Sequence, residues 1–187
     1  MTTFKWGFVG AGMIAKKALY PAISRSNVGE IHAVASRDAD KAMTISPKGK
    51  IYTDYDQLFA DPEVDGVYIS LPNAFHLPVA IRAMKAGKHV LCEKPLSANE
   101  VGAQSIADAA AANGRRAFVG FHYRLHGFTQ ELIKALSSGV LGKVEKVEFD
   151  FSIPHFVVKP GNIRLDGDLA GGAVMDVGCY AIDLIRA

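Results

Sequence analysis

Residues 5–15 read KWGFVGAGMIA, and this stretch decides the fold. An apolar segment, Lys5–Val9, runs directly into Gly10-Ala11-Gly12, and Ala15 stands three positions further on. In such a turn between a strand and a helix, the first glycine permits the sharp bend and the second lets a pyrophosphate approach bare backbone. The small third residue lets helix and strand pack closely, and the helix opening at Met13 and Ile14 presents unpaired amides. The turn therefore predicts a dinucleotide site, with a purely packing role as the alternative.

The rest of the first 120 residues repeats this pattern, because short apolar segments alternate with helical stripes. Such alternation is typical of a parallel sheet that helices cover on both faces. The segments expected to form strands are Lys5–Val9, Ile31–Ala35, Lys50–Tyr52, Val67–Ser70, His89–Cys92 and Ala117–Gly120. The predicted fold class is therefore α/β, with a doubly wound parallel sheet.

Two helices between these segments carry clear local signals. Pro21 should kink or shorten the first helix, because proline lacks the amide that a helix interior uses. The capping box Ser97-Ala98-Asn99-Glu100 predicts the start of a later helix, which should end at Gly114.

The last third of the chain is less complete. Phe128–Leu136 predicts a helix, and the alternation over Val147–Ile153 predicts a half-exposed, antiparallel strand. A loop rich in Gly and Asp then leads to a last helix from Ala173 to about Arg186. One strand and one helix cannot close a core of their own. We therefore expect either that they lean on the first domain or that most of a second α+β domain is missing.

The composition excludes several classes of protein. The 187 residues are 49% hydrophobic and 21% charged, which excludes disorder. The formal net charge is only +2, so nothing indicates nucleic-acid binding, and no apolar run is long enough for a membrane span. Cys92 and Cys179 form neither a disulfide framework nor a metal-binding pair, which suits a reducing compartment. We expect a cytoplasmic protein.

The end of the second predicted strand indicates which dinucleotide would bind. An acid at this place usually holds the ribose of NAD, but Ile31–Ala35 is followed by Ser36-Arg37. A hydroxyl and a guanidinium suit the 2′-phosphate of NADP, whereas a carboxylate would repel it. Asp38 could either reach the ribose or cap the next helix. We therefore predict NADP, with NAD as the second choice.

Two further strand ends carry polar groups. Leu71-Pro72-Asn73 follows the fourth predicted strand, with His76 at the start of the next helix, and Glu93-Lys94 follows the fifth strand. Ligands of open parallel sheets bind beyond the carboxyl ends of the strands, so we predict that these residues contact the coenzyme. For Lys94, a solvated lysine paired with Glu93 is the ordinary alternative.

These motifs, together with Gly171-Gly172 and the run Asp176-Val177-Gly178-Cys179-Tyr180, resemble the Gfo/Idh/MocA oxidoreductases. The resemblance implies a Rossmann domain over residues 1–121 and the beginning of an α+β domain over residues 122–187, incomplete in this chain. It implies NAD(P)-linked oxidation or reduction of a sugar, polyol or related alcohol. It also implies that Lys94 and the residue at position 180 act on the reacting oxygen. With a tyrosine at position 180, the chain resembles the branch of the family that contains glucose-fructose oxidoreductase, xylose dehydrogenase and dihydrodiol dehydrogenase.

The last predicted helix fits the same interpretation independently. Asp176, Tyr180 and Asp183 stand near one helix face, for which an exposed polar face is the alternative. A phenol has a pKa of about 10, which must fall by about two or three for the phenolate to act as a base near neutrality. The Lys94 ammonium could provide this stabilisation. The hypothesis is that Tyr180 exchanges the hydroxyl proton, Lys94 stabilises charge and Asp176 orients the substrate.

Three other side chains are weaker candidates. Arg124 leaves the same predicted sheet edge and could contact substrate, with a surface ion pair as the equal alternative. His122 and His126 have a spacing that a helix can offer to zinc, but no acid or cysteine nearby completes the set, so we predict no metal.

Two classes of function remain open from the sequence. One is an NADP-dependent sugar or alcohol dehydrogenase, and the other is a non-catalytic dinucleotide-binding module or subunit. In either case we expect a homo-oligomer, or a partner chain that completes the second domain.

Overall fold

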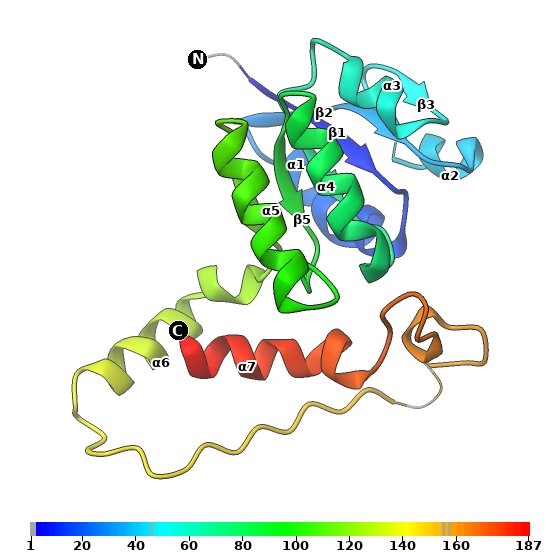
Figure 1. Ribbon diagram of the computed structural model, residues 1–187. Helices are drawn as coiled ribbons and strands as arrows, with labels where there is room; N and C mark the ends of the chain where they lie inside the picture. Colours follow the sequence, from blue (N-terminus) through cyan, green and yellow to red (C-terminus); the bar gives the residue numbers. More distant parts are fainter. Residues whose placement is uncertain (1–2, 46, 155, 157) are drawn as a thin grey trace. The chain divides into compact units, whose positions relative to one another are not determined.

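A computed structural model describes residues 3–45, 47–154, 156 and 158–187 of the chain (Figure 1). The chain divides into two compact units, which meet in sequence between Val119 and Gly120.

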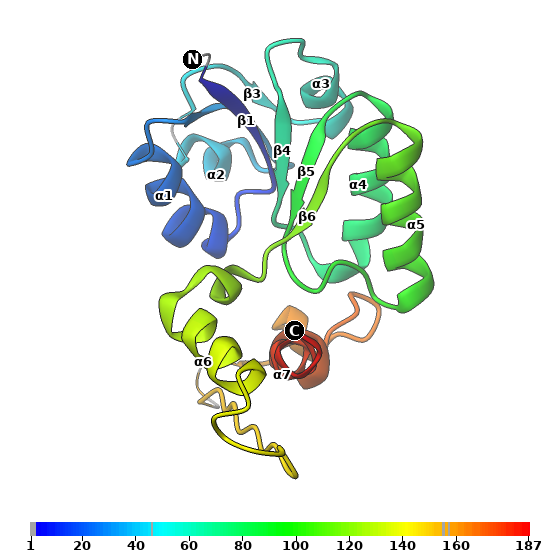
Figure 2. The same cartoon turned by 90° about the vertical axis from the view of Figure 1, so that its left-hand side faces the viewer.

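The first unit is built on a six-stranded sheet with the order β3-β2-β1-β4-β5-β6 (Figure 2). Every neighbouring pair of strands is parallel. The strands are β1 (Phe4–Val9), β2 (Gly29–Ala35), β3 (Ile51–Tyr52), β4 (Gly66–Ile69), β5 (His89–Cys92) and β6 (Ala117–Val119). This is the doubly wound order of the Rossmann fold, and it confirms the predicted fold class. Each predicted strand forms within two residues of its expected bounds.

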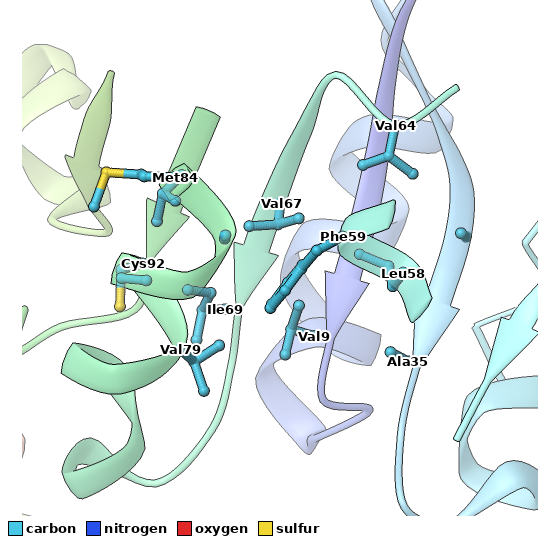
Figure 3. Packing of buried hydrophobic residues seen from close by; sticks show 14 of the residues in the cluster. Val9, Ala35, Leu58, Phe59, Val64, Val67, Ile69, Val79, Met84 and Cys92 are labelled. Carbon is cyan, nitrogen blue, oxygen red and sulfur yellow. The ribbon is translucent and has the colours of Figure 1, made fainter. Parts of the chain in front are cut away.

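Consecutive strand residues point to opposite faces of this sheet, so apolar side chains stand on both faces and helices cover both. Val9, Ile69 and Cys92 face one buried cluster, and Phe8 and Tyr68 face the other. The first cluster, seen in Figure 3, is closed by α3 (Tyr55–Ala60), α4 (His76–Lys85) and α5 (Glu100–Ala112). The second cluster is closed by the helical turn η1 (Ala15–Leu19) and by α1 (Tyr20–Ser24) and α2 (Ala39–Met43).

The first helix is interrupted where Pro21 predicts an interruption. A wide π-helical turn, η1, comes before the short α-helix α1, and Pro21 stands in the first turn of α1. Proline is tolerated there because the amides of a first turn have no intrahelical partner.

The start of α5 differs from the prediction. Asn99, not Ser97, is the N-cap, and its side-chain oxygen accepts a hydrogen bond of 2.8 Å from the backbone N–H of Gly102. Ser97 is buried against Gly102 instead, where an added Cβ would lie 2.1 Å from the serine Oγ. The predicted C-terminal end is confirmed, since Gly114 follows the helix with φ +59°.

The regular elements among the described residues of the second unit are all helical. They include η3 (His122–Leu125), α6 (Gly127–Ser137), η5 (Ile163–Leu165), the π-helical turn η6 (Val174–Gly178) and α7 (Cys179–Arg186). The prediction of a strand over Val147–Ile153 is wrong, because residues 144–154 adopt no regular structure. A strand needs a neighbour for its backbone groups, and no other described segment of this unit is a strand.

Among the described residues, none of the helices combines the length and the apolar character needed to cross a bilayer.

The attachment of α5 to the core gives a testable prediction. Ile106 is fully buried, whereas Val101 on the same helix is 77% exposed. Ile106→Ala should lower the free energy of unfolding by about 2–5 kcal/mol, because it removes apolar contacts and leaves a cavity. Val101→Ala should leave it unchanged within about 0.5 kcal/mol. Urea unfolding followed by the fluorescence of Trp6, the one tryptophan, measures both variants. Equal losses in the two variants would contradict this account.

Candidate functional site

In the turn after β1, the backbone conformation and the close packing both require a glycine at position 10. Gly10 has φ +91°, and its N–H donates a 2.9 Å hydrogen bond to the carbonyl of Ala35. An added Cβ at Gly10 would lie 2.9 Å from the carbonyl oxygen of Ser70. The hydroxyl of Ser70 donates to the carbonyl of Gly10 at 3.1 Å, so the turn is fixed against the end of β4.

The second glycine behaves differently. A Cβ at Gly12 would lie 3.5 Å from its nearest neighbour, the carbonyl oxygen of Ser70, which is an ordinary contact. Packing therefore accounts for Gly10, and for the fully buried Ala15, but not for Gly12. Met13 and Ile14, which follow, are 65% and 46% exposed. Bare backbone and helical amides at this place are what a dinucleotide phosphate requires, so the residues fit such a group.

The segment after β2 separates Asp38 from Arg37. Asp38 caps α2, because its Oδ1 accepts from the N–H of Lys41 at 3.1 Å. That backbone hydrogen bond, followed by the side chain of Lys41, lowers the pKa of Asp38. Ser36 is buried, and its Oγ accepts from the N–H of Asp38 at 3.2 Å. Arg37 is exposed and makes no ion pair within the described part of the chain.

The segment after β5 is anchored by a carboxylate. The N–H of Glu93 continues the ladder to the carbonyl of Ile69 at 2.9 Å. Its Oε1 accepts from the hydroxyl of Tyr68 at 2.7 Å, and its Oε2 accepts from the N–H of Lys94 at 3.3 Å. Burial, and then the charge of Glu93, raises the pKa of Tyr68. Glu93 therefore fixes the backbone that carries Lys94.

His76 is completely buried at the start of α4. Its two ring nitrogens lie 2.7 Å from the carbonyl oxygen of Pro95 and 2.9 Å from that of Leu71. Burial lowers its pKa from the ordinary value. The ring thus contacts the segments after β4 and β5 from inside the protein. A ligand could contact the ring only if the ring became exposed.

The parallel sheet brings these segments to one edge. They follow β1, β2, β4 and β5, which are consecutive neighbours in the sheet as β2-β1-β4-β5. The strand order reverses between β1 and β4, and open α/β sheets bind ligands in the crevice at this point. The predicted coenzyme residues that lie on these segments are Gly10, Gly12, Met13, Ile14, Ser36, Arg37, Leu71, Pro72, Asn73, Glu93 and Lys94.

In the second unit, Tyr180 lies among aromatic rings. Its ring centroid is 5.6 Å from that of Phe121, 5.7 Å from that of Tyr123 and 6.2 Å from that of Phe151. The ring of His122 lies at 6.2 Å as well. These side chains cover the ring of Tyr180, and their arrangement orients its phenol.

The two acids near Tyr180 are paired with arginines. Asp176 accepts from the guanidinium of Arg164. Asp183 accepts from Arg124 Nε at 2.7 Å, which is the ion pair weighed as the alternative for that arginine, and from the hydroxyl of Tyr123 at 2.5 Å. Burial, followed by the bond to Asp183, raises the pKa of Tyr123 to about 12. Sequence reasoning missed Arg164 and Tyr123, because neither stands at a regular spacing from its acid.

A pocket of about 230 Å³ adjoins the ion pair of Asp176 and Arg164. All the residues that line it belong to the second unit: Phe151, Ile153, Val158, Arg164, Leu165, Gly172, Ala173, Asp176 and Val177. Its wall combines apolar surface with two charged groups.

Histidines elsewhere have structural partners. His126 caps α6, since its Nδ1 accepts from the N–H of Phe128 at 3.3 Å. His32 Nε2 lies 3.4 Å from Asp61 Oδ2 and 3.7 Å from Glu63 Oε2, in a group whose atoms could surround a divalent ion. Lys5 Nζ lies 2.6 Å from Glu63 Oε1, and the hydroxyl of Tyr52 donates to Asp61 Oδ2 at 2.9 Å, so both carboxylates already have partners within the protein. We interpret the group as an ion-pair network.

Comparison with known proteins identifies the family. The family model described as "Oxidoreductase family, NAD-binding Rossmann fold" matches residues 4–121, and the model of the GFO/IDH/MocA C-terminal domain matches residues 129–187. The chain belongs to the Gfo/Idh/MocA oxidoreductase family. This confirms the resemblance drawn from the motifs and the NAD-binding character of the Rossmann unit.

Several relatives are known by activity or by structure. The chain is 39% identical over 186 residues to D-xylose 1-dehydrogenase (NADP(+)) 2 of Haloferax volcanii, covering 97% of this chain and 56% of that protein. It superimposes on the 3-ketoreductase KijD10 of Actinomadura kijaniata with a TM-score of 0.88 at 33% identity, again covering 97% and 56%. For the aldose-aldose oxidoreductase of Caulobacter crescentus the TM-score is 0.87 at 29% identity, covering 99% and 57%. The chain thus spans little more than half the length of these relatives.

The two glycines of the turn give a matched pair for experiment. Gly10→Ala should lower the free energy of unfolding by about 1–3 kcal/mol, because φ +91° strains any side chain and the Cβ meets Ser70. Gly12→Ala should cost less than about 1 kcal/mol, since its Cβ meets only an ordinary contact. Thermal and urea unfolding of both variants test this difference. A larger loss for Gly12→Ala would show that packing requires the second glycine too.

Proposed function

We propose that the protein transfers hydride between NADP and a sugar, polyol or related alcohol or carbonyl compound. The observation that carries this proposal is the convergence of the glycine turn, Ser36-Arg37, Asn73 and Lys94 on one edge of a parallel sheet, beside the reversal of strand order. The sugar-directed relatives support the substrate class. When bound, the nicotinamide would accept or give the hydride.

Preference for NADP follows from the charges after β2. Arg37 is exposed without an acidic partner in the described residues, whereas the carboxylate of Asp38 is used in capping α2. A free guanidinium attracts a phosphate dianion and can bind it through two parallel hydrogen bonds. The relatives agree, because the Haloferax enzyme is named for NADP(+) and KijD10 was solved in complex with NADP.

For the reaction we propose three catalytic residues. Tyr180 exchanges the proton of the substrate hydroxyl, and the Lys94 ammonium stabilises negative charge on the reacting oxygen. Asp176 orients the substrate, with Arg164 holding its carboxylate. Structures of KijD10 were determined with one lysine changed to Ala or Glu and with one tyrosine changed to Phe, the same two residue types. Arg124, paired with Asp183, is proposed as a more distant substrate contact.

A second candidate is a non-catalytic dinucleotide-binding module. It is favoured by the exposed apolar side chains of the irregular segment after α6, where Val147, Phe149 and Phe151 are 57%, 44% and 53% exposed. Large exposed apolar side chains in a row are typical of surfaces that another segment covers. We propose that a second copy or a partner chain covers them, which native mass spectrometry tests. Both candidates bind coenzyme, but only the first converts it.

Coenzyme choice is tested at Arg37. Wild-type protein should bind NADPH at least about tenfold more tightly than NADH, since a charged hydrogen bond contributes about 1.5–3 kcal/mol. Arg37→Ala should weaken NADPH binding by about that factor and leave NADH binding nearly unchanged. Arg25→Ala, another arginine of the first unit, serves as the control. Isothermal titration calorimetry measures all three proteins, and equal affinity of wild type for both coenzymes would defeat the proposal.

The catalytic assignment is tested at Lys94 and Tyr180. Lys94→Ala and Tyr180→Phe should each lower kcat/KM by about 10²–10⁴-fold, because each removes a group that acts on the reacting proton or its charge. The affinity for NADPH should change by less than about tenfold. Lys85→Ala and Tyr55→Phe change the same residue types outside the proposed catalytic set and serve as controls. Absorbance of the reduced nicotinamide, with a panel of aldoses, polyols and dicarbonyls, gives the rates. Activity within a few fold of wild type in either variant would refute the assignment.

A further inference from the structure

His76 joins two parts of the sheet edge that are far apart in sequence. Its Nε2 lies 2.9 Å from the carbonyl oxygen of Leu71, in the segment after β4. Its Nδ1 lies 2.7 Å from the carbonyl oxygen of Pro95, in the segment after β5. The imidazole is fully buried, and buried polar groups are retained where hydrogen bonds satisfy them. The ring therefore bridges two backbone carbonyls.

These carbonyls flank the residues on which the proposed reaction depends. Leu71 stands two residues before Asn73, and Pro95 directly follows Lys94. The ladder between β4 and β5 reaches as far as the bond from Glu93 N–H to the carbonyl of Ile69. Past that point, one ring nitrogen of His76 lies within hydrogen-bond distance of a backbone carbonyl in each segment.

We propose that His76 is a positioning residue, whose ring fixes the segment of Asn73 against the segment of Lys94. The inference rests on the proposed function, because it assigns a purpose to the placement of Lys94. A buried bridge of this kind holds the backbone that carries Lys94 in place without touching the substrate.

The number of protons on the ring sets the strength of the bridge. A neutral imidazole has one N–H and can donate to one carbonyl, whereas an imidazolium can donate to both. Burial is the largest influence on the pKa of His76 and lowers it. The carbonyls of Pro95 and Leu71 and the charge of Glu93 raise the pKa, and the charge of Lys94 lowers it. The net result is a lowered pKa. The ring is therefore neutral at pH 7, and the second hydrogen bond forms as the pH falls.

Amide hydrogen exchange, followed by mass spectrometry, tests the bridge directly. His76→Phe keeps a planar ring but has no donor, and His76→Gln restores an amide donor. Amides of residues 71–75 and 93–97 should exchange at least about tenfold faster in His76→Phe, and His76→Gln should recover part of this protection. His89→Gln is the matched control, because His89 stands at the opposite end of β5 and accepts from the N–H of Arg116. It should leave both segments as in wild type.

Two further readouts separate positioning from general stability. Because the pKa of His76 is lowered from 6.5, protection of both segments in wild type should rise only as the pH falls below about 6.5, after correction for intrinsic exchange rates, and should not rise in His76→Phe. In turnover, His76→Phe should lower kcat by about ten- to a hundredfold while the Kd for NADPH rises by less than about threefold, because misplacement affects Lys94 more than the diphosphate at the glycine turn.

The outcomes distinguish this inference from the proposed function. Unchanged exchange of both segments in His76→Phe overturns the positioning role, whatever the wild type does with coenzyme. Faster exchange, together with a wild type that neither binds nor converts coenzyme, supports the bridge and contradicts the proposed function. If His76→Phe does not fold, His76→Asn replaces it, because its shorter amide cannot reach both carbonyls.

Discussion

The parallel pairing of β1, β2, β4 and β5 is the constraint on which the candidate site depends. In a parallel sheet every strand ends at the same edge, so segments that are up to 80 or so residues apart in sequence become neighbours. The pairing is maintained by two buried clusters, one on each face of the sheet, that include alternate residues of the same strands. Because β1 and β4 are the central pair, the turn at Gly10 meets Ser70 directly, and the hydroxyl of Ser70 closes that contact. The part of the candidate site that lies in the first unit is therefore a consequence of the sheet.

At this edge, the described side chains fall into two groups. Asp38, Glu93 and His76 make hydrogen bonds to backbone groups and shape the segments that carry them. Arg37 has no ion-pair partner in the described residues. At Gly12 the carbonyl accepts from the N–H of Lys16 at 3.2 Å, but no close packing contact covers the position, so a ligand can approach it. This division has a physical basis, because a group that satisfies a backbone donor cannot give up that bond without leaving the donor unpaired. The acids and the histidine are therefore better suited to hold the shape of the edge than to bind coenzyme.

The sequence predicted those parts of the molecule that depend on local chemistry. Apolar runs located all six strands, and Pro21 and Gly114 marked an interruption and an end of helices. Choices between competing local groups were harder, since Ser97 and Asn99 can both cap a helix and only the tertiary fit of Ser97 against Gly102 selects Asn99. Val147–Ile153 has the alternation of a strand but no partner strand among the described residues, and pairing cannot be inferred from alternation alone. The bond of Asp176 to Arg164 and the burial of His76 are also tertiary facts.

The proximity of Asp38 to Arg37 bears on coenzyme choice. A carboxylate beside the 2′-phosphate would oppose NADP, but the backbone N–H and the ammonium of Lys41 both bind Asp38, the latter at 3.1 Å. These contacts lower the pKa of Asp38, so its carboxylate stays ionised at neutral pH and its charge is balanced locally by Lys41. Arg37 is then the cation of this segment that has no ion-pair partner among the described residues. Coulomb attraction between exposed groups decreases with distance and salt. For coenzyme choice, an unpaired guanidinium at the end of β2 would therefore matter more than the overall charge of +2. Because Asp38 caps α2 and pairs with Lys41, its carboxylate would repel a 2′-phosphate less than the sequence Ser36-Arg37-Asp38 alone suggests.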